Sequence, residues 1–176
     1  MKNIILTAFF SLVTTTLNAQ ISIGKSAITN ASVLMEFDNA LTNKKGIILS
    51  TVDNVTNAIG STPAANNGTF LFDRSDDRVK MYENNTWINL SDPGSETKIT
   101  PNTSAETTAN QGAIIGADTS NAKGVLVLEA SNKALVLPWI RDPHLTVLNP
   151  YPGMMCYDTT SRTLAVFDGT VWNYWK

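Results

Sequence analysis

The stretch Gly68-Thr-Phe-Leu-Phe-Asp73, which continues through Met81-Tyr82 to Trp87-Ile-Asn-Leu90, decides the fold that this sequence predicts. It recurs near the C-terminus as Gly153-Met-Met-Cys-Tyr-Asp158, Val166-Phe167 and Trp172-Asn-Tyr-Trp175, 85 positions later and without a gap. An internal repeat of this kind predicts two copies of one supersecondary unit. The structural markers of the two copies are Gly68, Asp73, Trp87, Gly153, Asp158 and Trp172.

Each copy predicts a three-strand antiparallel meander. In the first copy the expected strands are 69–72, 79–82 and 86–90, where short apolar and β-branched runs are separated by polar clusters. Asn84-Asn85 forms the second connection, because asparagine tolerates positive φ. The corresponding connection in the second copy is Asp168-Gly169, a strong two-residue hairpin signal.

The repeat extends upstream of the meander. Ile115-Gly116 matches Ile23-Gly24 and Val125-Leu126 matches Val33-Leu34, both 92 positions apart, and 133–137 matches 45–49 at 88. The spacing between matching residues of the two copies falls from 92 to 88 to 85 along the chain, which indicates small loop insertions in the first copy. The polar segment 52–65 is expected to be a loop, with one helical turn around 55–59. The predicted fold class is therefore all-β, with two tandem copies that each end in a meander.

Polar segments define the predicted domain boundaries. Residues 1–19 combine a short positive start, an apolar run over 4–13 and a small residue at Ala19, which is typical of a cleaved signal peptide. The apolar run is too short for a transmembrane helix, which is the alternative interpretation. Ser, Thr, Pro and Asn dominate 91–112, which predicts a linker. The expected order is a signal peptide (1–19), the first β repeat (20–90), the linker (91–112) and the second β repeat (113–176).

Charge and cysteine content exclude several classes of protein. The formal net charge is −2, whereas a nucleic-acid-binding protein shows a basic face. Cys156 is the only cysteine, so the chain cannot form an internal disulfide; its place in an apolar strand predicts a small buried side chain. No His, Cys and Asp spacing resembles a zinc site, so neither a metal nor a cofactor is predicted.

The sequence predicts no catalytic residue. His144 is the only imidazole and lies in the turn-like segment 141–144, where a solvated histidine is the favoured interpretation. The remote alternative is a small secreted hydrolase built around His144.

Aromatic residues provide the weak candidates for ligand binding: Tyr174, Trp175 and Trp139. Trp87 and Trp172 recur at the same place in both copies, which favours a role in closing each core. Core packing is also favoured for Trp175, and stacking on a sugar or capping of a subunit interface is the alternative.

The chain resembles a repeat of exported proteins from Bacteroidota-type bacteria and of phage tail-fibre-like proteins. The matching residues are Val33-Leu34, 45–49 and 68–87 in the first copy, and 125–128, 133–138 and 153–172 in the second. Both copies depart from the Pro-Arg step of that family, with Ser50-Thr51 and Pro138-Trp139 in its place. Asp158-Thr159-Thr160 also resembles an O-glycosylation triplet of such bacteria.

The resemblance implies a surface or fibre-type module that trimerises. The leading hypothesis is an exported, non-enzymatic structural or adhesive surface module, secreted or located at the cell surface or in the periplasm. Its expected partners are further copies of the chain, other surface proteins or glycans, with no nucleic acid and no transmembrane segment. The alternative is a secreted carbohydrate-binding module that uses the C-terminal aromatic residues.

Overall fold

The computed structural model describes residues 20–59, 63–101 and 112–176, and in these residues the protein is almost entirely β. The predicted all-β class is confirmed. The strands are β1 (Ile21–Ile23), β2 (Val33–Phe37), β3 (Ile47–Ile48), β4 (Thr51–Val52), β5 (Phe70–Asp73), β6 (Arg78–Glu83), β7 (Thr86–Asn89), β8 (Ala113–Ile115), β9 (Leu126–Leu128), β10 (Ala134–Val136), β11 (Trp139–Ile140), β12 (Met154–Asp158), β13 (Thr163–Phe167) and β14 (Trp172–Trp175). Helical turns are η1 (Val55–Asn57), η2 (Pro63–Asn66) and α2 (Pro143–Thr146).

The two predicted meanders are present as β5–β6–β7 and β12–β13–β14, each antiparallel throughout. Positions 85 apart pair in the same register: Phe72 lies opposite Val79, and Tyr157 lies opposite Leu164. The connections follow the turn chemistry, since Asn84 and Asn85 have φ of 49° and 61° and Gly169 has φ of 101°. Each meander therefore follows from alternation and turn residues that the sequence displays.

Two short parallel strands that the sequence does not predict extend the meanders. β4 pairs with β5 and places Thr51 opposite Phe72, and β11 pairs with β12 and places Trp139 opposite Tyr157. The predicted loop over 52–65 is therefore wrong at Val52, which lies in strand β4. A strand of two residues is too short to show a period in its hydrophobic residues. It can therefore be recognised only from its pairing with a neighbouring strand in the structure. The helical turn expected around 55–59 is present as the 3₁₀ turn η1.

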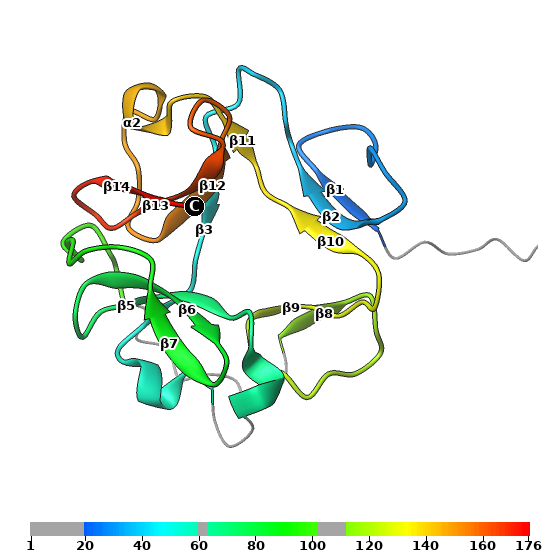
Figure 1. Cartoon of the computed structure of the whole chain (residues 1–176), viewed down its shortest axis with the longest axis horizontal. Helices are drawn as coiled ribbons and strands as arrows, with labels where there is room; N and C mark the ends of the chain where they lie inside the picture. Colours follow the sequence, from blue (N-terminus) through cyan, green and yellow to red (C-terminus); the bar gives the residue numbers. More distant parts are fainter. Residues whose placement is uncertain (1–19, 60–62, 102–111) are drawn as a thin grey trace, which may run out of the picture.

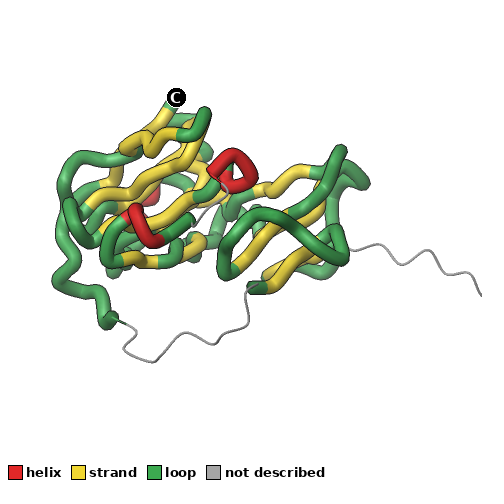
Figure 2. Tube along the Cα trace, turned by 90° about the horizontal axis from the view of Figure 1, so that it is seen from below, coloured by secondary structure: helices red, strands yellow, loops and turns green. Residues whose placement is uncertain are grey.

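Strands from the two halves of the chain are exchanged between sheets. β10 adds in parallel to β2 and completes the sheet β1–β2–β10. β3 adds in antiparallel orientation to β12 and completes the five-stranded sheet of the second meander. Figures 1 and 2 show the meanders together on one side of the molecule and the β1–β2–β10 and β8–β9 sheets on the other. The sequence halves 20–90 and 113–176 are thus interleaved in space.

The two meanders also share a hydrophobic core. Its buried members come from both: Phe72, Val79 and Leu90 from the first, and Met155 and Val166 from the second. A second core lies on the opposite face of the second meander and contains Ile140, Met154, Cys156, Ala165 and Phe167. Gly153 has φ of +79°, and a Cβ built there would lie 3.3 Å from the Cβ of Phe72, so this residue allows the two meanders to approach closely.

The described part of the predicted linker is packed against both meanders. The Gly94 N–H donates to the Asp77 carbonyl at 2.8 Å, and the Ser95 N–H donates to the Asp168 carbonyl at 2.8 Å. Ile99 packs against the shared core. The remainder of the linker, 102–111, and the predicted signal peptide, 1–19, lie outside the described residues, so the domain boundaries stay predictions.

A buried ion pair fastens the loop between β1 and β2. Glu36 is 2% exposed, and its carboxylate accepts from Lys25 Nζ at 2.7 Å and from the Thr29 N–H at 2.7 Å. Burial of the carboxylate opposes its ionisation, but the hydrogen bonds from Lys25 and Thr29 outweigh burial and lower the pKa of Glu36 to about 2.

We expect Glu36→Gln to lower the free energy of unfolding at pH 7 by about 1–2 kcal/mol, a value reduced for screening by nearby solvent. Because the folded pKa lies below the unfolded one, the ionised carboxylate stabilises the fold above pH 4.5, and this contribution is lost as the pH falls towards 2. Urea unfolding at pH 7 and pH 3 measures the difference, with the exposed Glu83→Gln as the control. An equal effect of Glu36→Gln at both pH values would contradict the assignment.

Candidate interaction surfaces

The second meander carries a row of aromatic and apolar side chains on one face of its sheet. Residues directly opposite one another in paired strands share a face, and the registers place Trp139 beside Tyr157, Tyr157 beside Leu164, and Leu164 beside Trp175. We call these four residues the aromatic row. They come from β11, β12, β13 and β14, and therefore cross the sheet from one side to the other.

The aromatic row is only partly covered. Trp139 and Trp175, at its two ends, are 37% and 41% exposed, and Tyr157 and Leu164 are half-buried. The rings of Trp139 and Tyr157 lie 6.0 Å apart at 48°, which orients both. Trp175, for which core packing is the favoured sequence interpretation, is therefore not a core residue of the single chain.

In the first meander the corresponding row is fully buried. Phe72, Val79 and Leu90 lie 85 positions before Tyr157, Leu164 and Trp175, and their exposed fractions are 0%, 0% and 4%. They are covered by Met155 and Val166 of the second meander. The same structural position is thus fully buried in one copy and partly exposed in the other, where Leu164 still packs against the shared core.

The opposite face of the second meander borders an open depression of about 560 Å³. Trp172, Tyr174 and His144 are among the residues that line it. His144 Nδ1 lies 2.9 Å from the Tyr174 hydroxyl, and the two rings meet edge to face. Burial, with nearby Asp158 adding to it, raises the pKa of the Tyr174 hydroxyl. The structure thereby brings together two of the residues that the sequence singles out.

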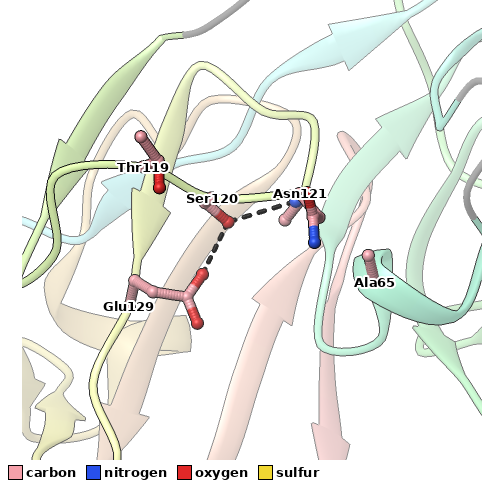
Figure 3. A pocket seen from close by; sticks show the side chains of 6 residues that line it. Ala65, Thr119, Ser120, Asn121 and Glu129 are labelled. Carbon is pink, nitrogen blue, oxygen red and sulfur yellow. Dashed lines mark hydrogen bonds between the residues drawn. The ribbon is translucent and has the colours of Figure 1, made fainter.

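A second depression, of about 350 Å³, lies between η2 and the segment before β9 (Figure 3). Ser120 Oγ donates to Glu129 Oε2 at 2.5 Å and accepts from the Ala122 N–H at 3.1 Å. Nucleophilic catalysis by serine requires a nearby base of the histidine type. Among the described residues, His144 has its side-chain hydrogen bond with Tyr174 instead. This arrangement gives the predicted hydrolase alternative no support.

The two marker aspartates, Asp73 and Asp158, are buried and hydrogen-bonded within the fold. Asp158 is 2% exposed, and its carboxylate accepts from the backbone N–H groups of Asp142, Thr160 and Ser161 at 3.0, 3.0 and 3.2 Å. Asp73 is fully buried and pairs with Lys80 Nζ at 2.7 Å. Both residues therefore have a structural role, and they do not form a ligand site.

Cys156 lies in the interior, whereas the two marker tryptophans are only partly buried. Cys156 is fully buried as predicted, and burial raises the pKa of its thiol to about 12. Trp87 and Trp172 are half-buried, with their rings 5.0 Å from Tyr82 and 5.5 Å from Phe167. Within the described residues no group of three or more His, Cys, Asp or Glu side chains is arranged to hold a metal ion. No described helix is long and apolar enough to cross a membrane.

Residues 114–176 match the family model of the phage tail like trimerisation region. The matched segment includes β9 to β14, and with them the whole aromatic row. The match supports the resemblance to phage tail-fibre-like proteins for this part of the chain. The resemblance to exported proteins of Bacteroidota-type bacteria stays a prediction. No curated protein and no solved structure matches the chain.

The matched segment contains all three candidates that the sequence singles out, but the structure places them on different surfaces. Trp139 and Trp175 belong to the aromatic row, whereas Tyr174 lies on the opposite face beside His144. Sequence reasoning missed Tyr157 and Leu164 as members of a surface. The sequence shows that both residues lie in predicted strands. It does not show the pairing register that places them in line with Trp139 and Trp175.

Proposed function

We propose that this protein is an exported, non-enzymatic structural module that assembles into a homotrimeric, fibre-like part at the cell surface. The match of 114–176 to the phage tail like trimerisation region carries the proposal. The chain itself supplies side chains suited to self-association, because Trp139 and Trp175 at the two ends of the row are 37% and 41% exposed in the single chain.

The physical reason for assembly is the exposed area of that row. Soluble monomers rarely expose contiguous apolar patches of this kind, and such patches mark interaction sites. Tryptophan and tyrosine are enriched among residues that contribute most to interface stability. An adhesive role of the assembled protein would use surfaces that remain free after assembly, such as the depression lined by His144 and Tyr174.

The test is the mass of the assembled protein. The full chain is produced with its own N-terminal segment, and its mass in solution is measured by light scattering over a wide concentration range. We expect a trimer, and mass spectrometry of the same sample should show loss of residues 1–19. A monomer at every concentration would overturn the assembly, and retention of the N-terminal segment would overturn the export.

A glycan array on the same sample addresses the carbohydrate-binding alternative. Binding that is lost on Tyr174→Ala and kept on Trp175→Ala would place a sugar in the depression beside His144. Aromatic rings stack on the apolar faces of sugars, and Trp172 and Tyr174 supply such rings there.

A further inference from the structure

The open depression beside His144 is built from three segments of one chain. His144 comes from α2, Trp172 and Tyr174 come from β14, and Lys98 comes from the described part of the predicted linker. The volume of about 560 Å³ falls within the range of roughly 300–1,000 Å³ that is typical of small-molecule sites. We call this feature the β14 depression.

The turn that leads into β14 fixes two of these segments to each other. The carboxylate of Asp168 is fully buried and accepts three hydrogen bonds, at 2.7–2.8 Å, from residues within 170–173. The Ser95 N–H donates to the Asp168 carbonyl at 2.8 Å, which attaches the segment that carries Lys98 to the same turn. A Cβ built on Gly169 would overlap the Ser95 carbonyl oxygen, so glycine allows this close approach. The β14 depression is therefore formed before any ligand arrives.

Two aromatic rings that line the β14 depression are ordered by neighbouring rings. Trp172 packs against Phe167, with ring centroids 5.5 Å apart at 49°. Tyr174 meets His144 edge to face, with centroids 6.2 Å apart at 84°. Trp172 is half-buried and Tyr174 is 40% exposed, so part of each ring reaches solvent. Ordered and partly exposed aromatic rings are surfaces on which the apolar C–H faces of sugar rings stack.

The pair of His144 and Tyr174 keeps one proton available for a ligand. His144 Nδ1 lies 2.9 Å from the Tyr174 hydroxyl. If the hydroxyl donates in this contact, neutral His144 carries its proton on Nε2, and if Nδ1 donates, the hydroxyl proton is left over. In both tautomers one donor stands beside the aromatic rings. The hydroxyl and carboxylate oxygens of a sugar accept from such a donor.

The lining of the β14 depression is positively charged. Lys98 is exposed, and its ammonium makes no ion pair with any residue that the structure describes. Among the described residues that line the depression, none is acidic. Of the carboxylates near it in sequence, that of Asp168 is buried, that of Glu96 pairs with Arg74, and Asp142 is half-buried outside the lining. A ligand that carries a carboxylate is therefore complementary in charge.

We propose that the β14 depression binds an acidic saccharide, whose sugar ring stacks on Trp172 and Tyr174 and whose carboxylate pairs with Lys98. The ligand class is that of oligosaccharides with uronic or sialic acid residues. This proposal rests on the adhesive part of the proposed function and gives it a site and a ligand class. It does not rest on the trimer, because all the residues that it uses come from one chain.

Titration calorimetry on the full chain tests the ligand class. The probes are short oligosaccharides that contain glucuronic, galacturonic or sialic acid, each compared with its carboxyl-reduced form, in which the carboxylate is replaced by a hydroxymethyl group. We expect at least one acidic probe to bind, and its carboxyl-reduced form to bind roughly fivefold more weakly or worse. Added salt should weaken only the acidic probe, because salt screens an exposed charge pair. A short polyglutamate peptide should not bind, because it has no sugar ring.

A pair of lysine variants tests the recognition of charge. We expect Lys98→Gln to raise the dissociation constant of the acidic probe roughly fivefold and to leave that of the carboxyl-reduced probe unchanged. Lys44→Gln is the control, since Lys44 is also exposed but does not line the depression. Circular dichroism checks that both variants are folded.

Two adjacent residues of β14 test the stacking. Tyr174 and Trp175 are 40% and 41% exposed, and they lie on opposite faces of the sheet. Tyr174→Ala should raise the dissociation constants of the acidic and the carboxyl-reduced probes by the same factor, roughly fivefold, because both probes lose the ring. Trp175→Ala should leave both constants unchanged. Tyr174→Phe keeps the ring and should retain most of the affinity, which makes the test independent of whether Tyr174→Ala folds.

The outcomes separate this proposal from the trimer. A wild-type protein that binds none of the acidic probes overturns the acidic-saccharide site, whatever its mass in solution. Equal binding of acidic and carboxyl-reduced probes, or equal effects of Lys98→Gln and Lys44→Gln, overturns the recognition of a carboxylate. Binding of polyglutamate as tightly as the acidic probe, or equal effects of Tyr174→Ala and Trp175→Ala, overturns the recognition of a sugar. A monomer that binds the acidic probe as expected overturns the trimer alone.

Discussion

Replacing Phe72 with alanine is expected to lower the free energy of unfolding by about 4 kcal/mol, the typical result of truncating a fully buried phenylalanine. Phe72 is 0% exposed and lies between the two meanders, in contact with the cluster that includes Met155 and Val166. Its removal therefore leaves a cavity that borders both halves of the chain. Chemical unfolding followed by tryptophan fluorescence measures the loss.

Phe70→Ala is the matched control, since Phe70 is in the same strand but half-buried. It should cost clearly less in a dilute, monomeric sample. Hydrogen exchange gives the decisive readout for a shared core: in Phe72→Ala the amides of β5–β7 and of β12–β14 should lose protection together. Loss of protection confined to β5–β7 would show that the two meanders are independent units.

Replacing Asp158 with asparagine is expected to lower the free energy of unfolding by about 3 kcal/mol, because hydrogen bonds to a buried charged group are the strong ones. Three backbone N–H groups donate to this carboxylate, and one of them belongs to Asp142 in the segment before α2. An asparagine side chain turns one acceptor atom into a donor and opposes at least one of these bonds. For a chain of this size the melting temperature should fall by roughly 10 °C.

The effect of Asp158→Asn depends on pH in a defined direction. Burial of Asp158 opposes ionisation, but hydrogen bonds from Ser161, Thr160 and Asp142 outweigh it and hold its pKa below the ordinary value of 3.8. The carboxylate therefore stabilises the fold above pH 3.8, and this contribution is lost as the pH falls below it. The exposed Asp118→Asn serves as the control in calorimetry at pH 7. Equal melting temperatures for Asp158→Asn and Asp118→Asn would contradict the structural role of Asp158.

The meanders were predictable because their signals are local. Short apolar runs over 69–72 and 79–82, and turn residues such as Asn84 and Gly169, determine strand and hairpin within a few positions. The burial of Cys156 was expected from its place in an apolar strand.

The candidate site was only partly predictable. Trp139, Tyr174 and Trp175 stood out by residue type, but their grouping depends on which strand lies beside which. Trp139 joins Tyr157 only because β11 adds in parallel to β12, and a two-residue parallel pair has no sequence period. Tyr174 and Trp175 are adjacent in sequence, yet their side chains lie on opposite faces of the sheet.

The sequence by itself therefore determined the β class, the two meanders and the turns that connect their strands, since alternation and turn residues act over short distances. The tertiary structure alone decided that β3 and β10 cross between the halves, that Phe72 is buried, and that its counterpart Tyr157 stays partly exposed. Equivalent sequences have different surroundings here because the contact between the copies is asymmetric. One row is fully buried inside the chain, whereas Trp139 and Trp175 of the other stay partly exposed.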